Sequence, residues 1–145
     1  MKILVQKVLN AAVTIDGQTV AQIKQGLLIF IGIEKDDTAS QADFLAKKVA
    51  NLRIFEDDNQ KMNLSVQDVK GEILAVSQFT LAADLSRGNR PGFESAAHPE
   101  IAKPLYEYFI KQLRSYDTPL KTGIFQADMK VSLINDGPCT FILQK

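Results

Sequence analysis

The chain is poor in residues that bind metals or form crosslinks. Its 145 residues include one cysteine, Cys139, one histidine, His98, and no tryptophan. A single cysteine excludes an internal disulfide and a zinc site built from several thiolates, and it suits a reducing compartment. A single histidine excludes a metal cluster with several imidazole ligands. We therefore expect no metal and no other cofactor.

The chain also lacks net charge and long hydrophobic runs. Seventeen basic and seventeen acidic residues cancel, so no protein-wide field attracts nucleic acid or anionic lipid. No apolar run reaches the roughly 18 residues of a membrane helix, and the opening "MKILVQKV" lacks the apolar region of a signal peptide. We expect a cytoplasmic protein with no membrane or DNA partner, in which any RNA contact is local.

The best local candidate for RNA contact is the segment "LSRGNRPGF". Arg87 and Arg90 lie there among glycine and proline, with no acidic residue between Asp84 and Glu94. Such a loop can contact phosphate groups. A short basic loop is more often a solvated surface, so both interpretations stay open.

The familiar catalytic motifs are missing as well. There is no glycine-rich phosphate loop and no G-x-S-x-G nucleophile turn. Ser77 and Thr80 would need a base, and His98 is the only conventional one. A Cys139/His98 pair is the simplest nucleophilic site to write down, but the sequence gives no sign that the two residues meet, and lone buried cysteines usually only pack.

What is present indicates one α/β domain over residues 1–145. The hydrophobic content of 46% is enough for a sizeable core. Valine-rich and isoleucine-rich segments predict strands over 2–15 and 17–23, joined at Asp16-Gly17, which is a hairpin signal. The continuous apolar run Gly26–Ile33 is typical of a central strand that is covered on both faces.

Two helices are expected. In the first, Thr38–Phe55, Thr38 and Gln41 have capping-box spacing, and the apolar stripe is Phe44, Leu45, Val49 and Leu52. The second runs from about Pro99 to Tyr116, and Pro104 should bend its first turns or move its start. Its apolar stripe is Ile101, Leu105, Tyr108, Phe109 and Leu113.

The polar stretch 56–71 reads as a surface loop, and a further strand is expected over 72–81. This strand begins as buried core and ends in polar side chains, Ser77, Gln78 and Thr80. The ends of strands are where open sheets usually bind ligands. The alternative is a strand that leaves the core and meets water.

The C-terminal third predicts three strands, over 120–125, 129–134 and 139–144, which brings the total to about seven or eight strands and two helices. Between the last two strands lies "NDGPCT", which contains Gly137-Pro138. Gly-Pro is poorly suited to a tight hairpin, because proline has no N–H to donate and restricts the preceding residue. This turn therefore needs another explanation.

Several segments together resemble one known family. They are "VQKV" at the start, "LRIFED" (52–57), "VSQFTLAAD" (76–84), "RGNRPGF" (87–93) and "FQADMKVSLINDGPCT" (125–140). The chain is similar over nearly its whole length to the bacterial D-aminoacyl-tRNA deacylases, also called D-tyrosyl-tRNA deacylases. The paired "SQFT" and "NDGP" motifs are highly specific.

The resemblance implies a fold, a partner and a reaction. The fold is a compact homodimer with an α/β/β layering. The substrates are D-aminoacyl-tRNA and glycyl-tRNA, whose ester to the terminal ribose is hydrolysed. The chiral filter is a cis Gly-Pro peptide, here Gly137-Pro138, that reaches across the dimer into the partner's pocket. That pocket is lined by the strand end, with Met129 near the filter; in this chain the strand end is Ser77, Gln78, Phe79 and Thr80.

The chemistry implied by the resemblance needs no reactive side chain. The ribose 2′-hydroxyl assists hydrolysis, and the Phe79 backbone N–H donates to the developing oxyanion. Thr80 is the obvious nucleophile, but no activator for its hydroxyl is evident. Gln78 would hold the ribose or the amino-acid carbonyl.

A backbone filter explains why chirality alone is read. A cis X-Pro bond lies behind a barrier of about 20 kcal/mol and orients neighbouring carbonyls similarly, which gives two acceptors for the substrate ammonium. An L side chain would then clash with the filter, whereas a D side chain points outward. Glycine has no side chain and cannot be excluded.

The chain departs from the family pattern at four positions. Gln126 stands where glycine is usual, Cys139 where valine is common, Lys7 where arginine is usual and Gly92 where serine is frequent. Lysine keeps the charge of arginine but loses its bidentate geometry. Two other classes of function remain as alternatives: a non-catalytic RNA- or nucleotide-binding domain on the same fold, and a hydrolase that depends on Cys139 and His98.

Overall fold

The computed structural model describes all 145 residues and forms eight strands, two α-helices and one 3-10 helix. This agrees with the predicted seven or eight strands and two helices. In chain order the elements are β1 (Lys2–Ile15), β2 (Gln18–Ile23), β3 (Gly26–Gly32), α1 (Ala39–Ala50), β4 (Phe55–Glu56), β5 (Met62–Leu64), β6 (Glu72–Ser77), the 3-10 helix η1 (Phe79–Ala82), α2 (Pro99–Arg114), β7 (Leu120–Thr122) and β8 (Lys130–Gln144). No helix is both long and apolar enough to cross a membrane.

Six strands form one sheet around the long strand β1. One edge of β1 pairs with β3 along its first half and with β2 along its second half, while β8 pairs with the other edge along most of its length. Strands β3, β6 and β7 continue the sheet in parallel. Strand β2 also lies close to β6 and β7 without pairing with them, so the sheet curls back toward itself.

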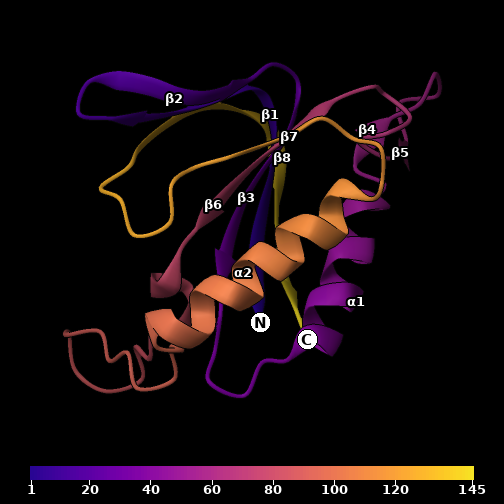
Figure 1. Cartoon of the computed structure of the whole chain (residues 1–145). Coiled ribbons are helices and arrows are strands. Elements are labelled where there is room, and N and C mark those ends of the chain that lie inside the picture. Colours follow the sequence, from indigo (N-terminus) through magenta and orange to yellow (C-terminus); the bar gives the residue numbers. More distant parts are fainter.

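The core has two parts because β3 and β6 are covered on both faces, as predicted for residues 26–33. Leu27, Ile29 and Ile31 of β3 pack with the helices, which cover one face of the sheet (Figure 1). The alternate residues of β3 and β6, including Leu28 and Leu74, pack in a second cluster under the curled strands β1 and β2. The molecule therefore has a helix layer and two sheet layers.

Helix α1 begins as predicted and ends earlier. Thr38 is its N-cap and forms the capping box with Gln41, but the helix stops at Ala50, and Phe44 is 48% exposed. The predicted stripe was therefore partly wrong. The buried face is small, and it consists of Ala42, Leu45, Ala46, Val49 and Ala50. Alanines on this face let the neighbouring helix α2 approach closely.

Helix α2 starts at Pro99 and keeps Pro104 inside it, so the proline does not move the start. The predicted stripe was again partly wrong, because Ile101 is 53% exposed and Tyr108 lies outside the buried set. The buried residues are Ala102, Tyr106, Phe109, Ile110 and Leu113. They also recur with helical spacing, so the prediction of an amphipathic helix was correct. The buried face lies part of a turn away from the predicted face.

Three other segments differ from the sequence-based expectation. The polar stretch 56–71 contains the short strand β5, which pairs with β4 in a separate two-stranded sheet. The strand predicted over 72–81 ends at Ser77 and gives way to η1. In addition, β7 covers only Leu120–Thr122 of the predicted 120–125.

The segment around Gly137-Pro138 is not a turn between two strands, which corrects the prediction. Strand β8 runs through it without reversing, antiparallel to β1. Gln6 pairs with Thr140 and Val8 pairs with Asn135, so residues 136–139 form a bulge opposite Lys7, in which Gly137 and Pro138 are exposed. Proline is tolerated in a bulge because no ladder hydrogen bond is needed there.

Candidate active site

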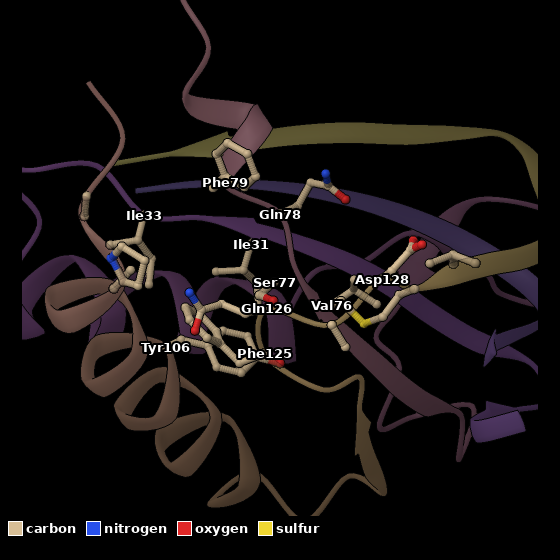
Figure 2. Close-up of a pocket in the computed structure, with 16 residues that line it drawn as sticks. Ile31, Ile33, Val76, Ser77, Gln78, Phe79, Tyr106, Phe125, Gln126 and Asp128 are labelled. Carbon is tan, nitrogen blue, oxygen red and sulfur yellow. The ribbon is translucent and has the colours of Figure 1, made fainter. Parts of the chain in front are cut away.

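A pocket of about 570 Å³ lies where the parallel strands β3 and β6 end. Its walls come from the ends of these strands, from the first turns of α2 and from residues 125–131 (Figure 2). Eleven of the sixteen lining residues are hydrophobic. A mostly apolar cavity with a few polar groups at the carboxyl ends of parallel strands is a typical place for a small ligand.

The predicted polar strand end forms one side of this pocket. Ser77, Gln78 and Phe79 all line it, and Gln78 and Phe79 lie on the η1 side of the opening (Figure 2). Thr80 is exposed and does not line the pocket. The Gln78 side-chain amide donates a hydrogen bond to the Thr80 hydroxyl oxygen at 2.6 Å, so the nearest polar partner of Thr80 is an amide and not a base.

An aromatic wall faces the strand end. The rings of Tyr106 and Phe125 lie 5.7 Å apart, and the Tyr106 hydroxyl donates to the Ala75 carbonyl at 3.3 Å. Burial raises the pKa of Tyr106 to about 12. The phenol is therefore neutral near pH 7 and holds its proton too tightly to act as a base. Neither residue was singled out from the sequence, where the helical spacing of Tyr106 with Phe109 and Leu113 was the available signal.

The segment after β7 closes the pocket on a third side. Met129, which the resemblance placed near the filter, lines the pocket, and Gly123 leaves the space that the Met129 sulfur occupies. Gln126 also lines the pocket, and its backbone is left-handed with φ of 65°. This conformation favours glycine, which gives a physical reason for the glycine that the resemblance puts at this position.

Gly137 and Pro138 are exposed at the bulge of β8 and do not line the pocket of their own chain. The peptide between them is cis, as expected. The bulge is held at its base: the buried Lys7 ammonium forms an ion pair with Asp136 at 3.1 Å, and the Asn135 side-chain amide donates to the carbonyls of Lys7 at 3.0 Å and Cys139 at 3.3 Å.

Cys139 and His98 are not brought together. Cys139 is 2% exposed and its thiol lies 3.9 Å from the Ile54 carbonyl oxygen. His98 is the exposed N-cap residue of α2, and its side chain makes no capping hydrogen bond. A thiol without an imidazole partner or solvent access is a packing residue.

Arg87 and Arg90 lie in an exposed loop that leads from η1 to α2 and do not line the pocket. The loop is closed by two backbone hydrogen bonds between Asp84 and Gly92, of 2.8 and 2.9 Å. Hydrogen bonds from Ser86 hold the pKa of the Asp84 carboxyl below its usual value. No group of three or more His, Cys, Asp or Glu side chains comes together as a metal site.

Comparison with known proteins gives consistent matches over the whole length. The family model described as D-Tyr-tRNA(Tyr) deacylase matches residues 4–144. A D-aminoacyl-tRNA deacylase of Geotalea uraniireducens is 57% identical over 144 residues, which cover 99% of this chain and 93% of that protein. One from Pelobacter propionicus is 52% identical over 145 residues, all of both chains.

Two solved structures share the fold. The c-Myc DNA unwinding element binding protein superposes with a TM-score of 0.94 at 40% identity, over 100% of this chain and 99% of that chain. A probable eukaryotic D-amino acid tRNA deacylase superposes with a TM-score of 0.82 over 98% of this chain and 97% of that chain. The sequence of that protein is 15% identical to this chain, so the similarity concerns the fold alone.

Proposed function

Because the chain belongs to the D-aminoacyl-tRNA deacylase family and is an enzyme that hydrolyses D-aminoacyl-tRNA, we propose that it is a chiral proofreader whose filter is supplied by a second subunit. It cleaves D-aminoacyl-tRNA and glycyl-tRNA and rejects L-aminoacyl-tRNA. The filter is Gly137-Pro138, and the ester binds in the pocket at the end of β6.

One observation carries this proposal: the filter and the pocket do not meet within a single chain. Gly137 and Pro138 are exposed on the β8 bulge, whereas the pocket is lined at the ends of β3 and β6. A homodimer in which each bulge enters the partner's pocket brings the two halves of the site together, and such reciprocal contacts fit a two-fold axis.

The surroundings of the filter support a role for its backbone. The Lys7–Asp136 ion pair and the two hydrogen bonds of Asn135 fix the base of the bulge. Backbone carbonyls at the bulge then accept hydrogen bonds from the substrate ammonium, and an L side chain collides with the main chain. Because no side chain of the filter reads the substrate, all D-amino acids are accepted, and glycine with them.

The chemistry is ester hydrolysis with the substrate's own hydroxyl as the proton carrier. Water adds to the ester carbonyl carbon, the Phe79 N–H donates to the resulting oxyanion, and the bond to the ribose 3′ oxygen breaks as that oxygen gains a proton through the 2′-hydroxyl. The products are the free amino acid and tRNA. The lack of a base beside Thr80 and the neutral Tyr106 phenol support this route.

A first experiment tests the pocket. Ester loss from D-tyrosyl-tRNA, L-tyrosyl-tRNA and the D-tyrosyl ester of adenosine is measured with the wild-type chain, with Phe79→Pro and with Phe79→Ala. Proline removes the N–H, and loss of one oxyanion donor lowers kcat by roughly 100- to 1,000-fold. Alanine keeps the N–H and should retain turnover on a small D-tyrosyl adenosine ester. Equal losses in both variants would contradict the oxyanion role.

A second experiment tests the filter. A Cβ at position 137 would lie 2.8 Å from the Asn135 side-chain oxygen, so Gly137→Ala disturbs the bulge. Chains with Gly137→Ala and chains with Phe79→Pro are coexpressed with different tags. If the filter acts across the dimer, half of the randomly paired dimers are mixed, and one of the two sites in each mixed dimer joins an intact pocket to an intact filter. About one quarter of the wild-type number of D-selective sites is then restored. A filter that acts within its own chain restores none.

A further inference from the structure

An exposed pair of phenylalanine rings lies at the rim of the pocket. Phe79 begins η1 and lines the pocket, and Phe93 follows Gly92 in the loop between η1 and α2. Their ring centroids are 5.1 Å apart, and the side chains are 58% and 40% exposed. Two large apolar rings that contact each other and still face solvent are typical of a binding surface. We call this pair the aromatic platform.

Two free cations accompany the aromatic platform. Arg87 and Arg90 lie in the same loop, in the part that the Asp84–Gly92 hydrogen bonds close, and this loop projects from the molecule between β6 and α2 (Figure 1). Neither arginine takes part in any of the ion pairs within the chain. The nearby Asp84 carboxylate accepts a hydrogen bond from the Ser86 N–H at 2.9 Å, within its own turn. The guanidinium groups are thus available to a ligand.

We propose that the aromatic platform, with Arg87 and Arg90, binds the unpaired 3′ strand of the tRNA. This inference rests on the proposed function, because an ester held in the pocket fixes the terminal nucleoside there. The preceding nucleotides must leave across the rim, and Phe79 stands at the rim opposite Tyr106 and Phe125 (Figure 2). A base of the exiting strand stacks on Phe93, and the arginines contact its phosphates.

The chemistry of the surface favours single-stranded RNA over a protein segment. Aromatic rings flanked by cations are the usual platform for unpaired nucleotides, since any base presents a π face and the backbone supplies the negative charge. The net charge of the whole chain is zero, so attraction to RNA must be concentrated at such a place. Stacking accepts every base, and therefore this surface adds affinity for tRNA without choosing among tRNAs.

The test compares two substrates with one variant. Phe93→Ala is assayed on D-tyrosyl-tRNA and on the D-tyrosyl ester of adenosine, which lacks the exiting strand. We expect kcat/KM on the tRNA to fall roughly 5- to 100-fold, mostly through KM, because one base can no longer stack. Activity on the adenosine ester should stay at the wild-type level, since Phe93 does not line the pocket. Phe93→Trp should preserve activity on both substrates.

Phe44 provides the matched control. It is another exposed phenylalanine, 48% exposed on α1, where the Lys145 ammonium lies 5.2 Å from its ring centroid. Phe44→Ala should change neither activity.

A second measurement tests the arginines. Replacing Arg87 and Arg90 by alanine should lower the slope of log KM against log salt by about 0.7 for each phosphate that the arginines neutralise in the wild type.

Three results would overturn the inference. Equal loss on both substrates means that Phe93 supports the pocket, and no loss on either means that the strand leaves elsewhere. Dissociation of Phe93→Ala into monomers in sedimentation means that the platform is a subunit interface. If the wild type hydrolyses neither substrate, the proposed function fails by itself, and anisotropy of a labelled single-stranded RNA ending in CCA still tests whether Phe93→Ala weakens binding.

Discussion

At the scale of single residues, Gln126 carries backbone strain inside the pocket wall. Its φ of 65° lies in the left-handed region, which costs a non-glycine residue roughly 1–2 kcal/mol. Glycine removes this cost, but its greater backbone freedom stabilises the unfolded chain by about 0.5–1 kcal/mol. The side chain lines the pocket, so this substitution also widens the cavity.

We predict that Gln126→Gly raises the free energy of unfolding by about 0.5–1 kcal/mol. Gln126→Ala is the control, because it removes the same amide but keeps the Cβ and its strain. Urea unfolding of both variants measures the difference. If alanine stabilises the chain as much as glycine does, the gain comes from removing the side chain and not from the backbone.

Thr80 is the residue most easily mistaken for a nucleophile. Its hydroxyl is exposed, lies outside the pocket and accepts a hydrogen bond from the Gln78 amide. We predict that Thr80→Ala keeps most of the wild-type rate on D-tyrosyl-tRNA, because substrate-assisted hydrolysis does not use this group. Single-turnover kinetics provide the measurement. A fall of several orders of magnitude would restore Thr80 as the nucleophile.

At the scale of elements, the bulge of β8 depends on an ion pair whose two side chains differ in burial. The Lys7 side chain is 9% exposed, whereas that of Asp136 is 35% exposed. Removing the acid leaves a buried cation without its partner, while removing the lysine leaves a carboxylate that water can reach. The two single substitutions are therefore not equivalent.

We predict that Asp136→Asn lowers the free energy of unfolding by about 1–3 kcal/mol and that Lys7→Met lowers it by less than about 1 kcal/mol. Both variants should lose part of their discrimination against L-tyrosyl-tRNA, since the bulge is less well held. Chemical denaturation and the ratio of D to L rates are the two measurements. Equal destabilisation by both substitutions would show that the burial of Lys7 does not matter.

The elements also show where sequence reasoning succeeded and where it stopped. Strand β3 and the capping box of α1 were predicted correctly, because continuous apolar runs and Thr-x-x-Gln spacing act locally. The buried faces of both helices were misjudged, because small residues were not counted: Ala42 and Ala102 are buried while Phe44 and Ile101 are exposed. On α2 the large residues Tyr106 and Ile110 were missed as well, because the predicted face was rotated away from the buried one.

The pocket was predicted only in part for a related reason. Ser77 and Gln78 are visible in the sequence as polar residues after an apolar strand, and Met129 follows from the family motif. Tyr106 and Phe125 join them only through the curl of the sheet and the packing of α2, which depend on contacts between distant segments. Likewise, the bulge at Gly137 is invisible locally, because pairing with β1 determines whether β8 turns or continues.

At the scale of the whole molecule, the buried phenol of Tyr106 links stability to alkaline pH. Its pKa is raised from 10.0 to about 12 by burial, so between these values the folded chain keeps a proton that the unfolded chain releases. The unfolding free energy must therefore fall as pH rises from about 10 to 12, by roughly 2–3 kcal/mol from this group.

We predict that the wild type loses this amount relative to Tyr106→Phe over the same pH interval. The variant lacks the titrating phenol and also lacks the hydrogen bond to the Ala75 carbonyl, so it should be less stable at pH 8. This difference should shrink as pH rises and reverse by pH 12, because one hydrogen bond contributes only about 0.5–1.5 kcal/mol. Urea unfolding at several pH values gives the difference curve. A constant difference would mean that Tyr106 titrates normally.

Strand β8 has a partner only on its β1 side, and it carries Gly137-Pro138, which we propose as the filter. An outer strand opens more readily than the buried middle of a sheet. Local opening of β8 should therefore disturb the proposed filter at Gly137-Pro138 sooner than the pocket residues on β3 and β6, which lie in the middle of the sheet. If the proposed filter is correct, a chain damaged in this way hydrolyses L-aminoacyl-tRNA as well as the D form.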